Sequence, residues 1–292
     1  MSDTQPESRG LGGLPIIGAL LDPPPTVAVV RLSGVIGGMG GLRRGLSLGT
    51  QAGVLQRAFK LRNLKAVALA VNSPGGSPVQ SALIAGRIRQ LADEKQIPVV
   101  AFAEDVAASG GYWLACAADE IYADASSIIG SIGVVSGGFG LQGLIEKLGV
   151  ERRLHTAGDK KAMLDPFQPE KPAEVKHLKD IQGDIHEAFK DMVRARRGDR
   201  LKGAEKDLFS GAFWTGSKAV ELGLIDGLGD LRAVMRARYG DKVKLRVVGE
   251  RRGLFGRLRF GALSGDAPAG PDWAGQAVAA IEERMIWNRF GL

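Results

Sequence analysis

Short, nearly continuous apolar runs alternate with helical patterns from Thr26 onward, and this alternation constrains the fold most strongly. The runs 27–32, 66–71 and 97–103 read as buried strands, and each is followed by a segment whose apolar residues recur at helical spacing. Strands that lack polar alternation and are separated by helices are typical of a mainly parallel sheet covered on both faces. The sequence therefore predicts an α/β fold.

Three regions are expected along the chain. Residues 1–25 contain Gly and Pro throughout and are predicted to be a disordered lead-in. Residues 26–240 form the predicted domain, which includes a long amphipathic helix at 172–197 and shorter helical pieces up to residue 239. Residues 241–292 are predicted to hold a closing strand at 244–248 and a basic amphipathic tail.

Composition excludes several classes of protein. Of 292 residues, 45% are hydrophobic and 24% are charged, as in a soluble globular protein. The single cysteine, Cys116, excludes an intramolecular disulfide and a cysteine-cluster metal site, so a reducing compartment is expected and no metal or other cofactor is predicted. No apolar run is long enough to span a membrane, and the polar N-terminus does not resemble a secretory signal. A cytoplasmic location is the resulting expectation.

The net charge of +7 raises the question of an acidic partner. Basic and aromatic residues are not interleaved in the body of the chain, which argues against nucleic-acid binding. In the tail, residues 251–260 combine arginines with Leu and Phe, and a second apolar segment follows at 277–290. Peripheral contact with an anionic membrane surface and packing of this tail on the protein body both stay open.

Ser109 is the candidate nucleophile. It lies in Ser109-Gly-Gly-Tyr-Trp113, shortly after the third predicted strand, where glycines allow close backbone approach and leave N–H groups free near the hydroxyl. A serine nucleophile needs a base, yet the three histidines, His155, His177 and His186, all lie outside Gly/Ser-rich turns. The last two fall on the polar face of the long helix. Lysine can replace histidine when its ammonium is desolvated.

Three further segments carry candidate site residues. Gly75 and Gly76 follow a predicted strand in Asn72-Ser-Pro-Gly-Gly76, so their N–H groups could stabilise an oxyanion or merely form a turn. Ser131 lies among small residues in 129–133, and Lys161 lies in a predicted loop. Each segment taken alone has an ordinary structural explanation.

Taken in order, four motifs resemble the signal peptide peptidase family of serine proteases, the protease IV type. They are Ser-Pro-Gly-Gly at 73–76, Ser-Gly-Gly-Tyr-Trp at 109–113, Gly-Ser-Ile-Gly at 130–133, and Gly-x-x-Lys-x-x-x-x-Pro-Phe at 158–167. Segments 209–216 and 219–226 are similar to the family's downstream signature, and the resemblance covers roughly residues 26–240. It implies that Ser109 is the nucleophile, Lys161 the general base and Ser131 the residue that holds the lysine. Gly75 or Gly76 would supply the oxyanion N–H.

The resemblance also implies a fold, a reaction and an assembly. The expected fold is the crotonase or Clp-protease-like spiral of β-β-α repeats with a C-terminal helical region. The expected reaction is cleavage of signal peptides or other short apolar peptides through an acyl-enzyme. Similar proteins form homo-oligomeric rings in which the lysine of one protomer can complete the serine site of its neighbour.

The sequence departs from the family pattern in three respects. Lys160 stands before Lys161 where an aromatic residue is commoner, the N-terminal membrane anchor has no counterpart, and the chain matches one repeat of the longer, duplicated members.

Two alternatives to the peptidase stay open. A crotonase-type acyl-CoA hydratase or isomerase would hold a thioester enolate with backbone N–H groups and would use a carboxylate such as Glu104, Asp105 or Asp119. A non-catalytic scaffold that gathers membrane proteins would need neither Ser109 nor Lys161.

Overall fold

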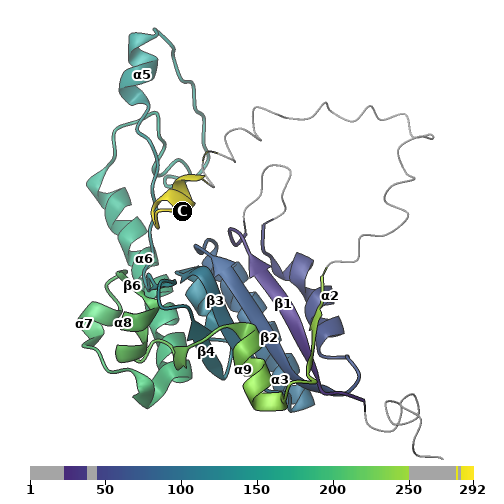
Figure 1. Ribbon diagram of the computed structural model, residues 1–292. Coiled ribbons are helices and arrows are strands. Elements are labelled where there is room, and N and C mark those ends of the chain that lie inside the picture. The colour runs from purple at the N-terminus through teal and green to yellow at the C-terminus, as the bar shows by residue number, and fades with distance from the viewer. Residues whose placement is uncertain (1–22, 38–44, 250–280, 282–283) are drawn as a thin grey trace, which may run out of the picture.

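The computed structural model describes residues 23–37, 45–249, 281 and 284–292. Most of the predicted lead-in at 1–25 and most of the predicted basic tail lie outside these ranges. The described residues form an eight-stranded sheet with helices packed against it (Figure 1).

The sheet is built mainly from parallel strands, as the apolar runs predict. Its order is β6-β5-β3-β2-β1-β8, with β4 paired to β3 and β7 paired to β4; only the pairing of β5 with β6 is antiparallel. The strands are β1 (Thr26–Ser33), β2 (Leu64–Ser73), β3 (Val99–Ala108), β4 (Glu120–Ala123), β5 (Ile128–Gly130), β6 (Phe213–Thr215), β7 (Gly227–Leu228) and β8 (Lys244–Val247).

Three helices cover one face of this sheet, namely α2 (Leu48–Ala58), α3 (Pro78–Lys95) and α4 (Gly110–Ala115). Ser47 caps α2 with a capping box, and Ser77 caps α3, which has Pro78 in its first turn. Their apolar sides bury Leu55, Ile84 and the neighbouring core residues against the strands. This packing fixes where β3 ends and α4 begins.

A second buried cluster lies on the opposite face of the sheet, which is covered over part of its area. The helix α9 (Leu231–Tyr239) buries Met235 on this face, against Val27, Ala66 and their neighbours in β1, β2 and β3. α9 is nine residues long, so it does not reach the carboxyl ends of the strands. A cavity lies on the part of the face that α9 leaves open.

A long arm projects from the sheet (Figure 1). It contains α5 (Gln142–Lys147), none of whose residues is buried, and the first part of α6 (Pro172–Arg197). The buried residues of α6 are Phe189, Val193 and Arg197, all in its last three turns. Two short helices, α7 (Glu205–Leu208) and α8 (Gly216–Glu221), follow α6, with a 3-10 turn at Gly198–Arg200 between α6 and α7.

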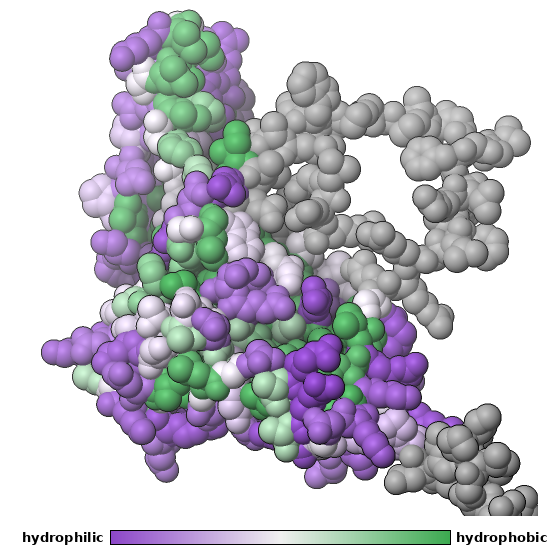
Figure 2. Space-filling view, in the orientation of Figure 1, coloured by the Kyte–Doolittle hydropathy of each residue, from purple (hydrophilic) through white to green (hydrophobic). Residues whose placement is uncertain are grey.

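Apolar side chains are exposed along this arm (Figure 2). They are Val135, Phe139, Leu144, Leu148, Val150, Leu154 and Ile181. A soluble protein rarely leaves so many large apolar side chains together in water, so this surface is typical of one that another molecule covers.

Candidate active site

Ser109 stands at the junction of β3 and α4 in an unusual backbone conformation. Its φ is 52° and its ψ is −123°, which a non-glycine residue adopts at a cost of about 1–3 kcal/mol. Its N–H donates to the Gly130 carbonyl at 2.8 Å, and its own carbonyl accepts from the Trp113 N–H at 3.0 Å. The Ser109 side chain makes no capping hydrogen bond to α4, so the hydroxyl is not used as a helix cap.

Gly75 lies directly against Ser109. A Cβ on Gly75, whose φ is +104°, would stand 2.7 Å from the Ser109 Cβ, so no other residue fits here without displacement. The Gly75 N–H donates to Ser73 Oγ at 3.2 Å, and the Gly75 carbonyl accepts from the Ile36 N–H at 2.8 Å. Within the described ranges the N–H of Gly76 has no hydrogen-bond acceptor. The glycine loop, residues 72–76, therefore touches the serine, and within the described residues its uncommitted glycine N–H is that of Gly76.

Ser131 lies beside Ser109 because β3 and β5 are parallel neighbours. Ala108 is in register with Gly130, so the residues that follow them, Ser109 and Ser131, are adjacent at the ends of the two strands. Ser131 is buried with a φ of 52°, and its N–H donates to the Ala212 carbonyl at 2.7 Å. The segments that contain Gly75, Ser109 and Ser131 thus meet where β2, β3 and β5 end.

His186 is a residue of this neighbourhood that the sequence interpretation missed. Its Nε2 lies 3.1 Å from the carbonyl oxygen of Ile132, the residue after Ser131. The side chain is half-buried, so its assignment to the solvated face of the helix is wrong. The spacing of 186, 189, 193 and 197 could have revealed this, because it is a helical repeat that ends on the buried residues of α6.

Lys161 lies on the arm, in the segment between α5 and α6. The residue is exposed, its N–H donates to the Gly158 carbonyl at 3.1 Å, and within the described chain its ammonium makes no hydrogen bond to Ser109 or Ser131. Lys160 is also exposed. One copy of the chain therefore brings together Ser109, Ser131 and the glycine loop, but not the lysine.

A buried ion pair between Arg197 and Asp226 lies close to α4. Arg197 donates to Asp226 at 2.7 Å and to the Gly223 carbonyl, while the Tyr112 hydroxyl donates to the Leu224 carbonyl at 2.6 Å. Burial raises the pKa of Tyr112 well above its usual value and that of Cys116 to about 11, so both groups are neutral near pH 7. These side chains hold α4, the helix that follows Ser109, in place.

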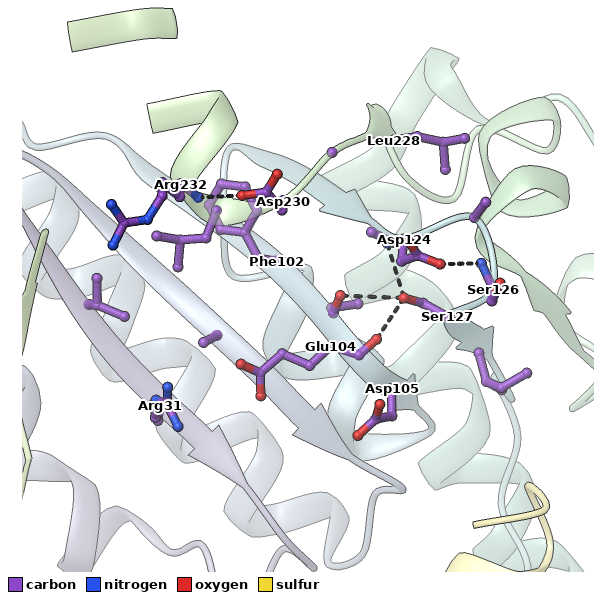
Figure 3. Close-up of a pocket in the computed structure, with 18 of the residues that line it drawn as sticks. Arg31, Phe102, Glu104, Asp105, Asp124, Ser126, Ser127, Leu228, Asp230 and Arg232 are labelled. Carbon is purple, nitrogen blue, oxygen red and sulfur yellow. Dashed lines mark hydrogen bonds between the residues drawn. The ribbon is translucent and has the colours of Figure 1, made fainter. Parts of the chain in front are cut away.

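The cavity on the open face of the sheet is separate from this constellation (Figure 3). Glu104 and Asp105 of β3 line it, whereas Ser109, Ser131 and the glycine loop do not. Within the described ranges, no three His, Cys, Asp or Glu side chains are grouped as metal ligands would be. No described helix has the length and apolar character that crossing a membrane requires.

Comparison with known proteins decides the family. A sequence model of peptidase family S49 matches residues 92–244, which include Ser109, Ser131 and Lys161. The chain belongs to peptidase family S49. The expected signal peptide peptidase family is thereby confirmed, and with it the α/β fold of the Clp-protease kind.

Relatives of this S49 protein carry several names. A "Putative protease slr0021" from Synechocystis is 32% identical over 224 residues, which are 74% of this chain and 80% of the relative. A "Putative signal peptide peptidase SppA" from Enterococcus faecium is 35% identical over 175 residues, 60% of this chain and 50% of the relative. A protein from Brucella abortus named "Na(+)/H(+) antiporter NhaA" is 53% identical over 273 residues, 91% of this chain but 37% of the relative. The chain thus spans little more than a third of that protein.

Proposed function

We propose that this protein is a serine endopeptidase in which Ser109 is the nucleophile and Lys161 the general base. The observation that carries the proposal is the backbone of Ser109, a non-glycine residue with a φ of 52° whose hydroxyl is not used as a helix cap. Such a conformation persists only where the surroundings enforce it, and it holds the hydroxyl at the start of α4 next to Ser131.

In the proposed reaction the Ser109 hydroxyl oxygen attacks the carbonyl carbon of a peptide bond. The neutral Lys161 amine takes the hydroxyl proton and then gives it to the nitrogen of the leaving amine as the C–N bond breaks. The resulting ester on Ser109 is hydrolysed by water, whose proton passes again through the lysine. Ser131, buried beside Ser109, is positioned to accept a hydrogen bond from the lysine amine and orient it.

Two N–H groups are suited to stabilise the oxyanion of this reaction. The Gly110 N–H follows the nucleophile and opens α4, and the Gly76 N–H has no acceptor within the described chain. Gly75 is less suited as a donor because its N–H is bonded to Ser73 Oγ. Its role in the proposal is instead the close approach to Ser109.

We propose further that the lysine reaches the serine from a neighbouring copy in a homo-oligomeric ring. Lys161 is exposed on the projecting arm, and the same arm exposes a row of large apolar side chains, including Phe139, Leu144 and Leu148. A second copy packed on this arm would bury the apolar row and desolvate the lysine, which favours its neutral form.

The proposed substrates are signal peptides or other short apolar peptides. The support is the family together with the name of the Enterococcus relative, a putative signal peptide peptidase. A cytoplasmic location and contact of the basic tail with anionic membranes stay predictions.

The crotonase-type alternative has weak support from the three carboxylates considered for it. Asp119 accepts hydrogen bonds from Arg89 and from the Val99 N–H. It therefore has a structural role at the start of β3. Glu104 and Asp105 line the cavity on the open face and not the Ser109 site.

The test is hydrolysis of an apolar peptide by wild type and by Ser109→Ala. We expect the variant to lose hydrolysis and labelling by a fluorophosphonate probe, while its native mass is unchanged. Ser217→Ala, at an exposed serine of α8, is the matched control and should behave as wild type. Hydrolysis that survives in Ser109→Ala would contradict the proposal, and an unlabelled wild type that nevertheless hydrolyses peptide would also contradict it.

A further inference from the structure

The open face of the sheet contains a cavity of about 1160 Å³ with an apolar floor (Figure 3). Its floor is hollow because the middle strand carries the small side chain of Ala70 between Arg31 on β1 and Phe102 on β3, with which Ala70 is in register. Val29 and Leu245 continue the apolar lining toward β8. The cavity is slightly larger than a usual small-ligand pocket, and charged and hydroxyl-bearing side chains surround its apolar floor.

Opposite charges stand on two sides of this floor. Arg31 and Arg232 lie on one side, and the carboxylate of Glu104 reaches in from β3 (Figure 3). Within the described residues neither guanidinium group and no oxygen of the Glu104 carboxylate makes a hydrogen bond or an ion pair, although Asp105 is bonded to Asn72 and Asp230 caps α9. Of the charged side chains that line the cavity, Arg31, Arg232 and Glu104 therefore have no partner within the described residues, whereas Asp105, Asp124 and Asp230 each accept a hydrogen bond.

The separation of these charges sets the length of a ligand that would join them. Arg31 and Glu104 are two strands apart, which is about 10 Å at the usual strand spacing. Glu104 lies at a bulge of β3, because Val71 pairs with Ala103 but Ser73 pairs with Ala107, so it stands only a short way beyond Phe102 along the sheet. The backbone separation of about 10 Å, shortened by the reach of the two side chains, suits a peptide of at most about three extended residues.

We infer that this cavity binds a short apolar peptide with both ends free. Glu104 would bind the terminal ammonium, Arg31 together with Arg232 would bind the terminal carboxylate, and the apolar side chains would lie on Ala70 and Phe102. A free peptide of this kind is the class of product that the proposed function releases, and that link rests on the proposed function. The binding itself does not, because the cavity excludes Ser109.

The experiment is calorimetric titration of the full chain carrying Ser109→Ala with the tripeptide Ala-Val-Leu. Acetyl-Ala-Val-Leu, which lacks the ammonium, and the C-terminal amide, which lacks the carboxylate, are the matched ligands. We expect each modification to weaken binding about two- to fivefold, as the loss of one exposed charge pair should. Glu104→Gln should weaken binding of the free tripeptide by a similar factor and abolish the effect of acetylation. Arg31→Gln should reduce the effect of amidation, and the double variant with Arg232→Gln should abolish it.

Glu94→Gln on α3 and Arg62→Gln after α2 remove equivalent exposed charges away from the cavity and should leave binding unchanged. Absence of binding at millimolar tripeptide would overturn the inference, as would equal affinity for the three ligands. It would also fail if the acetylation effect survived in Glu104→Gln. Since Ser109→Ala is used throughout, each of these results is independent of whether the protein cleaves peptides.

Discussion

Ser109 is fixed by its backbone, which leaves its side chain available. The N–H is bonded to Gly130, the carbonyl is bonded to Trp113, and Gly75 presses against the Cβ. Every one of these contacts is made by main chain or by a residue without a side chain. If Ser109 is the nucleophile as proposed, it can react without releasing any hydrogen bond that holds the turn.

The His186 ring contacts the main chain near Ser131. The His186 ring reaches the carbonyl of Ile132, and Ile132 directly follows Ser131. Both the neutral Nε2–H form and the charged form of the ring can donate this bond. His186 is thus a positioning residue that ties the Ser131 loop to α6.

We expect His186→Ala to lower kcat for peptide hydrolysis about five- to tenfold with little change in KM, since one positioning hydrogen bond is lost. His186→Gln should restore most of the rate because its side-chain amide can still donate. His177→Ala, at an exposed position on the same helix, is the control and should have no effect. Equal losses in the Ala and Gln variants would show that packing, and not the hydrogen bond, is what His186 supplies.

The two segments of the downstream family signature, 209–216 and 219–226, contact the elements around Ser109 and Ser131. Ala212, within 209–216, accepts the Ser131 N–H, and Trp214 packs over Gly130, where a Cβ would stand 2.8 Å from the ring. Asp226, which ends the signature at 219–226, holds Arg197 at the end of α6. Both segments therefore support the strand ends on which Ser109 and Ser131 stand.

The ion pair of Asp226 with Arg197 is expected to make the free energy of unfolding depend on pH. Burial alone would raise the pKa of Asp226, but hydrogen bonds from Arg197 and from the Ile121 N–H outweigh it, so the pKa lies below its ordinary value. Asp226 thus stabilises the fold fully above its unfolded pKa of about 3.9, and this contribution is lost as the pH falls through the lower folded value. Asp226→Asn should lower the free energy of unfolding at pH 7 by about 3 kcal/mol, because it leaves a buried guanidinium without its anion.

Urea unfolding of wild type and Asp226→Asn at pH 7 and near pH 3 measures this. The gap between the two proteins should shrink at the acid end, and Asp241→Asn, at an exposed aspartate, should match wild type at both values. A gap that stays constant with pH would mean that the carboxylate charge contributes nothing to the difference.

The elements were predictable from sequence to different extents. The helix at 172–197 has the predicted bounds because Pro172 opens it and Gly198 ends it. The strand β3 runs five residues further than its apolar run, through Glu104 and Asp105, because those two side chains face the cavity and not the core. The short strands β5, β6 and β7 depend on tertiary pairing, which no local pattern encodes.

The site was predictable in its residues but not in its geometry. Motif order identifies Ser109, Ser131 and the glycine loop, which the structure places together. The same motifs also single out Lys161, which stands apart on the arm. In the sequence, the apolar residues of the arm cannot be distinguished from core residues. The spacing of apolar residues does not say whether the surface that covers them belongs to the same chain or to another copy.

For the whole molecule, the exposed arm and the separated lysine have one common explanation. If the ring is head-to-tail, each copy gives its arm to one neighbour and receives another neighbour's arm at its own serine. Every active site would then contain Ser109 of one chain and Lys161 of the next. A single chain would hold both residues without holding a complete site.

Mixing two inactive variants tests this claim most directly. Ser109→Ala and Lys161→Ala should each be inactive alone, and Lys160→Ala should keep most activity. After subunit exchange in an equal mixture, about a quarter of the sites should pair an intact serine with an intact lysine, so about a quarter of wild-type activity should return. If native mass spectrometry confirms exchange and no activity returns, the serine and the lysine act within one chain and the account of a shared site is wrong.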